Sequence, residues 1–170
     1  KNYSYSCKEK TMSQAGYGRS LDQFLSESNG AIIKTLKSYV SDVSDSQIKA
    51  WHDSIKVFKN TAEELKITAP EILSNSSIIL EYTIPLESRR VDAILLLNGV
   101  VISAEFKGKN QPLQADIDQA AAYARDLQSY HKHCASSTVK CLLVLSQGFD
   151  GSETKGGVEI IGSEALTKYC

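Results

Sequence analysis

The stretch that decides the fold is RVDAILLLNGVVISAEFK, residues 90–107. Two apolar runs flank Asn98-Gly99, and an Asn-Gly dipeptide between such runs is the strongest short-range signal for a β-hairpin with a type I′ turn. The sequence therefore predicts two antiparallel strands, residues 90–97 and 100–107. Both faces of this hairpin are mostly apolar, which is typical of central strands covered on both sides.

A two-residue turn also fixes the register of the hairpin. Leu97 then pairs with Val100. Counting outward puts Asp92 directly opposite Glu105. Directly opposed residues share a face, with Cβ atoms roughly 4.5–5.5 Å apart. Lys107 lies two residues beyond Glu105 and points to the same face. We therefore expect two carboxylates and one ammonium group close together in a buried hairpin.

Two neighbouring carboxylates in a partly buried hairpin repel each other and need compensation. One solution is a shared proton, and the other is a divalent cation. In the second solution, a Mg²⁺ or Mn²⁺ ion is held by Asp92, Glu105 and the backbone carbonyl of Phe106. Lys107 then orients an attacking water and stabilises charge on a phosphate. This arrangement predicts phosphodiester hydrolysis. A structural ion pair between Lys107 and either acid is the alternative.

The remaining pattern predicts helices before the hairpin and an alternation of strand and helix around it. Helical spacing of apolar residues covers residues 19–68, where Ser44 offers N-cap chemistry for the longest helix. Further elements are expected as a strand at 78–86, a helix at 114–131, a buried strand at 138–146, a short strand at 156–161 and a helical turn from Ser163. The resulting order, α-β-β-β-α-β after the first two helices, predicts an α/β (α+β) fold with a mixed sheet.

Length and composition fit one globular domain, with 170 residues of which 42% are hydrophobic and 23% charged. We expect a polar arm over residues 1–18 and one domain over 19–170. That domain divides into a helical part (19–68), a core with the site (76–147) and a C-terminal strand with a helical turn (156–170). The chain does not begin with Met, which indicates processing or a longer parent protein.

Charge and cysteine usage exclude some classes. A net charge of −1 excludes a strongly basic, histone-like binder, but not a nuclease, because local charge steers a polyanion. The four cysteines have no CxxC spacing, so we expect free thiols rather than a zinc site or disulfides. No apolar run approaches the roughly 18 residues of a membrane span, and the first twenty residues are polar. We therefore expect a cytoplasmic protein that does not contact a membrane.

A third element lies on the helix predicted after the hairpin. Gln119 and Tyr123 are four residues apart and share a helix face; taken alone, they form an ordinary polar helix edge. Together, however, RVD (90–92), AEFK (104–107) and QAAAY (119–123) resemble the PD-(D/E)XK nuclease superfamily. The last string is similar to the QxxxY motif of its RecB-like branch.

The resemblance implies a restriction-endonuclease-like core with extra N-terminal helices. It implies that Asp92 and Glu105 bind the metal and that Lys107 assists the water. Gln119 and Tyr123 would then support the site and contact the substrate. The chain departs from the motif at one position, where Val91 replaces the Pro that names the family.

A looser resemblance connects the chain to the nuclease-like segment that precedes the helicases of a Schlafen-related bacterial group. It is carried by FL (24–25), WHDSI (51–55) and EYTIP (81–85). The chain has no Walker A motif, so a helicase module would be a partner outside this chain. The resemblance points to a module of an antiviral-defence or repair enzyme.

Further charged residues are candidates for the metal site and for phosphate contacts. Glu81, on the strand next to the hairpin, is the first candidate for another metal ligand, ahead of Glu63 and Glu64 on the preceding helix. The alternative for Glu81 is an ion pair with Arg89 or Arg90. Basic side chains expected to contact nucleic acid are Arg89, Arg90, Lys109 and Arg125.

These observations predict a Mg²⁺- or Mn²⁺-dependent nuclease, with DNA favoured over RNA as the substrate. Two alternatives stay open. The first is a catalytically degenerate nuclease fold that binds nucleic acid or a protein, and the second is an RNA-directed nuclease. The complete set of Asp92, Glu105 and Lys107 argues against the first, because a pure binder has no need of opposed carboxylates.

Overall fold

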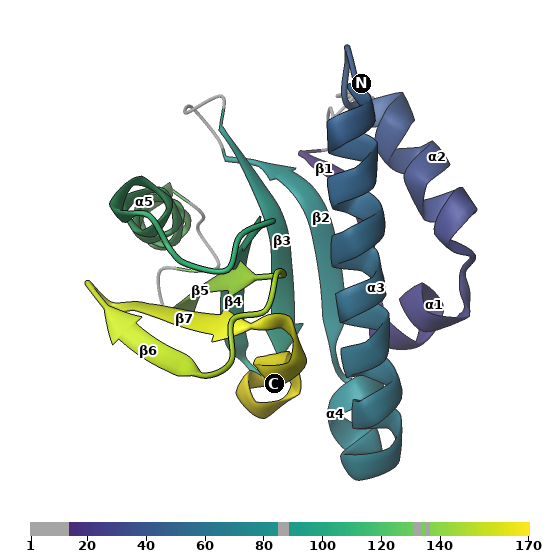
Figure 1. Cartoon of the computed structure of the whole chain (residues 1–170). Coiled ribbons are helices and arrows are strands. Elements are labelled where there is room, and N and C mark those ends of the chain that lie inside the picture. Colours follow the sequence, from purple (N-terminus) through teal and green to yellow (C-terminus); the bar gives the residue numbers. More distant parts are fainter. Residues whose placement is uncertain (1–13, 85–88, 131–133, 135–136) are drawn as a thin grey trace, which may run out of the picture.

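Seven strands form one mixed sheet in the computed structural model, which describes residues 14–84, 89–130, 134 and 137–170 (Figure 1). The strands are β1 (Ala15–Ser20), β2 (Ser77–Thr83), β3 (Arg90–Leu97), β4 (Val100–Lys107), β5 (Thr138–Leu145), β6 (Ser152–Lys155) and β7 (Val158–Gly162). Their order in the sheet is β1-β2-β3-β4-β5-β7-β6. Strands β1 to β4 are antiparallel neighbours, whereas β5 is parallel to both β4 and β7. The predicted mixed α/β class is confirmed.

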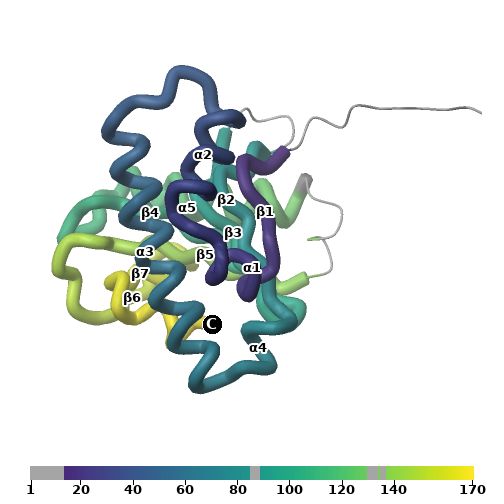
Figure 2. The backbone as a smooth tube through the Cα atoms, turned by 90° about the vertical axis from the view of Figure 1, so that its right-hand side faces the viewer, coloured from purple at the N-terminus to yellow at the C-terminus, as the bar shows by residue number. Residues whose placement is uncertain are grey.

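Helices cover both faces of this sheet. They are α1 (Leu21–Ser26), α2 (Asn29–Tyr39), α3 (Asp45–Thr68), α4 (Pro70–Ser74), α5 (Gln114–Tyr130) and the 3₁₀ helix η1 (Ser163–Tyr169). Figures 1 and 2 show α3 on one side of the sheet and α5 on the other. Apart from the short helix α4, which was not predicted, the series α3-β2-β3-β4-α5-β5 has the predicted order of elements. In the described part of the chain, no helix has the length and apolar character needed to cross a membrane.

Serine side chains cap the N-termini of the first three helices. The hydroxyl of Ser20 accepts a hydrogen bond from the backbone N–H of Gln23, and Ser28 does the same for α2. Ser44 accepts from the N–H of Gln47, as its predicted role requires. Each bond satisfies one N–H group that the first turn of a helix leaves without a partner. These caps fix where α1, α2 and α3 begin.

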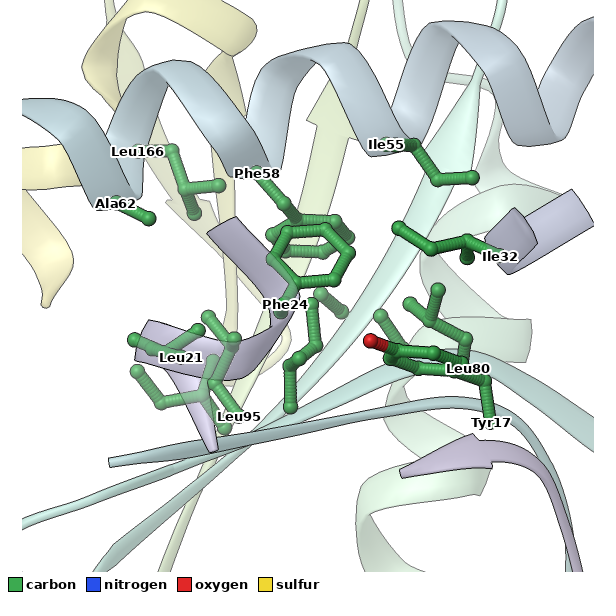
Figure 3. Packing of buried hydrophobic residues seen from close by; sticks show 14 of the residues in the cluster. Tyr17, Leu21, Phe24, Ile32, Ile55, Phe58, Ala62, Leu80, Leu95 and Leu166 are labelled. Atoms are coloured by element: carbon green, nitrogen blue, oxygen red, sulfur yellow. The ribbon is translucent and has the colours of Figure 1, made fainter. Parts of the chain in front are cut away.

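The larger part of the core lies between the sheet and α1 to α4 (Figure 3). Phe24, Ile55 and Phe58 are each at most 2% exposed and meet Leu80 and Leu95 of the sheet. On the opposite face, Ile94 and Val101 pack with Tyr123 and Leu127 of α5. The prediction that both faces of the hairpin are covered is therefore confirmed.

The hairpin between β3 and β4 has the predicted turn and register. Asn98 and Gly99 both have left-handed backbone conformations, with φ of 45° and 82°, as a type I′ turn requires. Pairing runs from Leu97–Val100 to Ala93–Ala104 without a shift. The next positions outward are Asp92 and Glu105, so the turn places the two acids at the same end of the hairpin, just beyond its last regular pair.

We expect Gly99→Ala to lower the free energy of unfolding by about 1–2 kcal/mol, because a Cβ disfavours the left-handed conformation at φ 82°. Gly30→Ala is the matched control. Gly30 lies in α2 with open space around its Cα, so an alanine there raises stability by up to about 1 kcal/mol. Urea unfolding of both variants measures the difference, and equal effects would contradict the role given to the turn.

Two strands were not predicted from the sequence, and some boundaries differ. The arm expected over residues 1–18 is shorter, because residues 15–18 belong to β1. Its residues 1–13 lie outside the described part of the chain. Strand β6 is exposed along most of its length and has no apolar alternation to indicate it. The end of the strand predicted at 78–86 and the end of the helix predicted at 114–131 also fall on undescribed residues.

The cysteines that the structure describes are free thiols. Cys134 and Cys141 are buried, and Cys170 is partly buried. Burial raises the pKa of Cys141 and of Cys170 to about 12, so both thiols are protonated at neutral pH. Cys7 lies outside the described residues. Protonated, buried thiols are weak nucleophiles and weak metal ligands.

Candidate active site

The site lies at the end of the β3–β4 hairpin, away from its turn. The Asp92 Oδ2 atom accepts a hydrogen bond of 2.9 Å from the backbone N–H of Phe106. Phe106 stands between Glu105 and Lys107, so the Asp92 carboxylate reaches across to the ExK segment. Glu105 is only 4% exposed. The structure thus brings together the three residues predicted for the active centre.

Burial and mutual repulsion perturb both acids. Burial raises the pKa of Asp92 to about 6, and the charge of Glu81 adds to this, while the hydrogen bond from Phe106 opposes it. Burial, followed by the charge of Asp92, raises the pKa of Glu105 to about 8. Since two close carboxylates in a desolvated site cannot both ionise easily, the pair holds a proton at neutral pH or requires a cation.

One carboxylate oxygen of this pair has no protein partner. Glu105 Oε1 accepts from the Lys107 ammonium group at 3.0 Å, whereas the buried Oε2 atom has no hydrogen-bond partner among the described residues. A buried carboxylate oxygen without a partner is costly. The donor set beside it is hard oxygen, which suits Mg²⁺ or Mn²⁺. The residues present therefore fit a divalent cation.

The predicted helix motif is connected to the same site by hydrogen bonds. Lys107 Nζ donates to Gln119 Oε1 at 3.0 Å, and Gln119 Nε2 donates to the Tyr123 hydroxyl at 2.8 Å. Both ends of the Gln119 amide are thereby occupied, which fixes its orientation. Burial lowers the pKa of Lys107, but the charges of Glu105 and Asp92 outweigh it and raise the pKa overall. Lys107 is therefore a positioned ammonium group at neutral pH.

Glu81 lies on β2 between Leu80 and Tyr82, which pair with Ala93 and Val91 on either side of Asp92. The side chains of both strands change face at this point. Glu81 has a left-handed φ of 53°, which is unusual for a residue with a Cβ. Before it, Leu80 packs on the α3 side; after it, Tyr82 packs on the α5 side. In a regular strand these two would share a face. Val91 and Ala93 of β3 are divided in the same way, so Asp92 borders the α3 side rather than facing α5 with Ile94.

The Glu81 carboxylate is held by three donors. Its Oε1 atom accepts from Trp51 Nε1 at 2.6 Å and from Gln47 Nε2 at 3.2 Å, both on α3. Its Oε2 atom lies 3.3 Å from Arg90 Nε. The ion pair with Arg90 is the alternative that the sequence left open for Glu81. Sequence reasoning missed Gln47, and no local signal marks it, because the contact joins residues 34 positions apart.

The helix acids named as runners-up are not part of this cluster. Glu63 and Glu64 are exposed on α3, and Glu64 Oε2 accepts from Thr167 Oγ1 of η1 at 2.6 Å. In the residues that the structure describes, no group of three or more His, Cys, Asp and Glu side chains is arranged around a common point. The charge of Glu81 raises the pKa of both Asp92 and Glu105, and the role of the Phe106 carbonyl stays a prediction.

Most of the basic residues predicted to contact nucleic acid are already paired with acids. Arg89 lies 3.5 Å from Asp126, Arg90 pairs with Glu81, and Lys109 Nζ lies 2.8 Å from Asp116. Arg125 is exposed on α5. Contact of these side chains with a substrate stays a prediction.

The comparisons add no relative. The sequence matches no protein-family model, and a search of curated proteins finds no significant match. The function proposed below therefore rests on the geometry and chemistry of the chain's own residues.

Proposed function

We propose that this chain is a metal-dependent nuclease that hydrolyses phosphodiester bonds, with DNA favoured over RNA. The observation that carries the proposal is the buried pair Asp92–Glu105, whose Glu105 Oε2 atom has no partner among the described residues. A cation at this point offsets the repulsion of the two acids. The neighbouring ammonium group of Lys107 explains why a phosphate would be attracted to so acidic a pair.

Each residue has a distinct role in this proposal. Asp92 and Glu105 hold a Mg²⁺ or Mn²⁺ ion, which when bound supplies a water of lowered pKa and neutralises phosphate charge. Glu81 is left out of the ligand set because Trp51, Gln47 and Arg90 already occupy its oxygens. Instead, it ties α3 to the strands that carry the acids.

Lys107 acts on the substrate rather than on the metal. Its Nζ atom is fixed between Glu105 Oε1 and Gln119 Oε1, so it needs little rearrangement to donate to a phosphate oxygen as negative charge develops there. Gln119, oriented by Tyr123, holds the ammonium group in place. This set is what the resemblance to PD-(D/E)XK nucleases of the RecB-like branch implies, and the proposal that the chain is a module of a defence or repair enzyme rests on that resemblance.

The test is a cleavage assay with Mg²⁺ or Mn²⁺ on single-stranded DNA, double-stranded DNA and RNA. We expect the wild-type chain to cleave at least one of them and Asp92→Asn to lose about a hundredfold or more of the rate, since it removes one of two charged ligands. Asp118→Asn, on the exposed face of α5, is the control. Undiminished cleavage by Asp92→Asn would sink the proposal, and binding without cleavage would favour the degenerate, binding-only alternative.

A further inference from the structure

A groove leads away from the site along α3. Near Asp92, a cavity of about 40 Å³ is lined by Ala50, Ser54 and Phe106, among others. The same three residues border the next cavity, of about 220 Å³, which continues into one of about 260 Å³. The groove is therefore continuous from the site to the start of η1, over more than three turns of α3.

The opposite wall consists of the turns that follow the parallel strands β4 and β5. Gly108 follows β4, while Ser146 and Gln147 follow β5, and all three line the groove. Backbone hydrogen bonds join these turns, from Ser146 N–H to Lys107 O at 3.0 Å and from Gln147 N–H to Lys109 O at 3.1 Å. The wall is thus held in place at the carboxyl ends of parallel strands, where α/β sheets commonly bind ligands.

Two lysines on α3 border the groove with unpaired ammonium groups. Lys49 and Lys56 are exposed, and neither forms an ion pair or hydrogen bond with another described residue. They are seven residues apart, about 10 Å along the helix axis. By contrast, Arg89, Arg90 and Lys109 each have an acidic partner. Lys49 and Lys56 are therefore the cations beside the groove that are available to a polyanion.

We propose that this groove binds one single strand of the nucleic-acid substrate and leads it to the site, with Lys49 and Lys56 contacting its phosphates. The proposal rests on the nuclease function proposed above. A single strand is favoured because the cavity where the groove reaches Asp92 has a volume of only about 40 Å³, which leaves no room for a duplex. Asp53 and Glu164 also border the groove, so its charged lining has both signs.

The experiment measures binding without cleavage, using a fluorescein-labelled single-stranded oligonucleotide of mixed sequence in EDTA. We expect Lys49→Ala/Lys56→Ala to weaken binding by about tenfold at low salt and to reduce the slope of log K against log salt by about 1.4, the value for two lost phosphate contacts on a single strand. Asp53→Asn removes a negative charge from the groove and is expected to strengthen binding.

The matched control is Lys34→Ala/Lys37→Ala, which removes the same charge from exposed positions on α2. If both double variants bind alike while the wild type cleaves nucleic acid, the groove assignment is wrong and the nuclease function stands. If the wild type neither binds nor cleaves, both fail. A blunt duplex that competes as well as the single strand, mole for mole, would overturn the single-strand assignment.

Cleavage kinetics separate substrate binding by the groove from catalysis at the site. The Lys49→Ala/Lys56→Ala variant is expected to raise KM by about tenfold and to keep kcat, because the lysines bind substrate away from the reacting atoms. An equal loss in kcat would place these lysines in the chemistry and contradict their assignment to the groove.

Discussion

Lys107→Met is expected to reduce the rate of metal-dependent cleavage by about a hundred- to a thousandfold, the usual effect of removing one fixed donor to a developing negative charge. Methionine keeps much of the length and apolar character of the lysine stem, so the fold is preserved. What it lacks is the ammonium group that lies 3.0 Å from Glu105 Oε1 and 3.0 Å from Gln119 Oε1. The measurement is single-turnover cleavage at saturating Mn²⁺.

The control is Lys140→Met, which removes the same charge from an exposed position on β5. The Lys107→Met variant should still bind the single-stranded oligonucleotide in EDTA, because its loss is confined to the site. A rate within threefold of the wild type would show that Lys107 is only a structural partner of Glu105, which is the alternative that the sequence left open.

Glu105→Gln is expected to stabilise the metal-free protein at pH 8 while removing its response to metal. The pKa of Glu105 is raised from 4.5 to about 8, so the folded state binds more protons than the unfolded state between these values. Stability therefore falls as the pH rises through this window. Glutamine has no charge to desolvate, and we expect the variant to gain on the order of 3 kcal/mol at pH 8 and little below pH 5.

Urea unfolding at pH 5 and pH 8 measures this difference, with EDTA present. Glu153→Gln, at a partly exposed position of β6, is the control and should follow the wild type at both pH values. In thermal unfolding at pH 8, Mn²⁺ should raise the Tm of the wild type and leave that of Glu105→Gln unchanged. An identical pH dependence in wild type and variant would refute the view that Glu105 carries the unfavourable charge.

The hairpin and its acids could be predicted because their geometry is local. Asn98-Gly99 allows one turn type, and the turn fixes every pair outward to Ala93–Ala104. Long helices were predictable for the same reason, since apolar spacing and a serine cap mark α3 within its own sequence. The Lys107–Gln119 contact follows once α5 is known to cross over between two adjacent parallel strands.

The parts that sequence reasoning missed depend on distant residues. Strand β1 contains two glycines and pairs with β2, about sixty residues later, and a Cβ at Gly16 would meet Leu36, Tyr39 and Glu81 at 3.0–3.1 Å. The change of face at Glu81 depends on a left-handed backbone that no local pattern marks. The partners of Arg89 and Lys109 are likewise set by how α5 packs.

The edge strand β6 also affects how the protein behaves at high concentration. Strand β6 has four residues and ends the sheet, so its outer backbone groups are open to pairing with another chain. Its side chains are polar throughout, and Glu153 and Lys155 of this strand form an ion pair of 3.4 Å. A short, charged edge is a poor template for adding a strand, and β6 thereby protects the otherwise apolar sheet beside it from edge-to-edge aggregation.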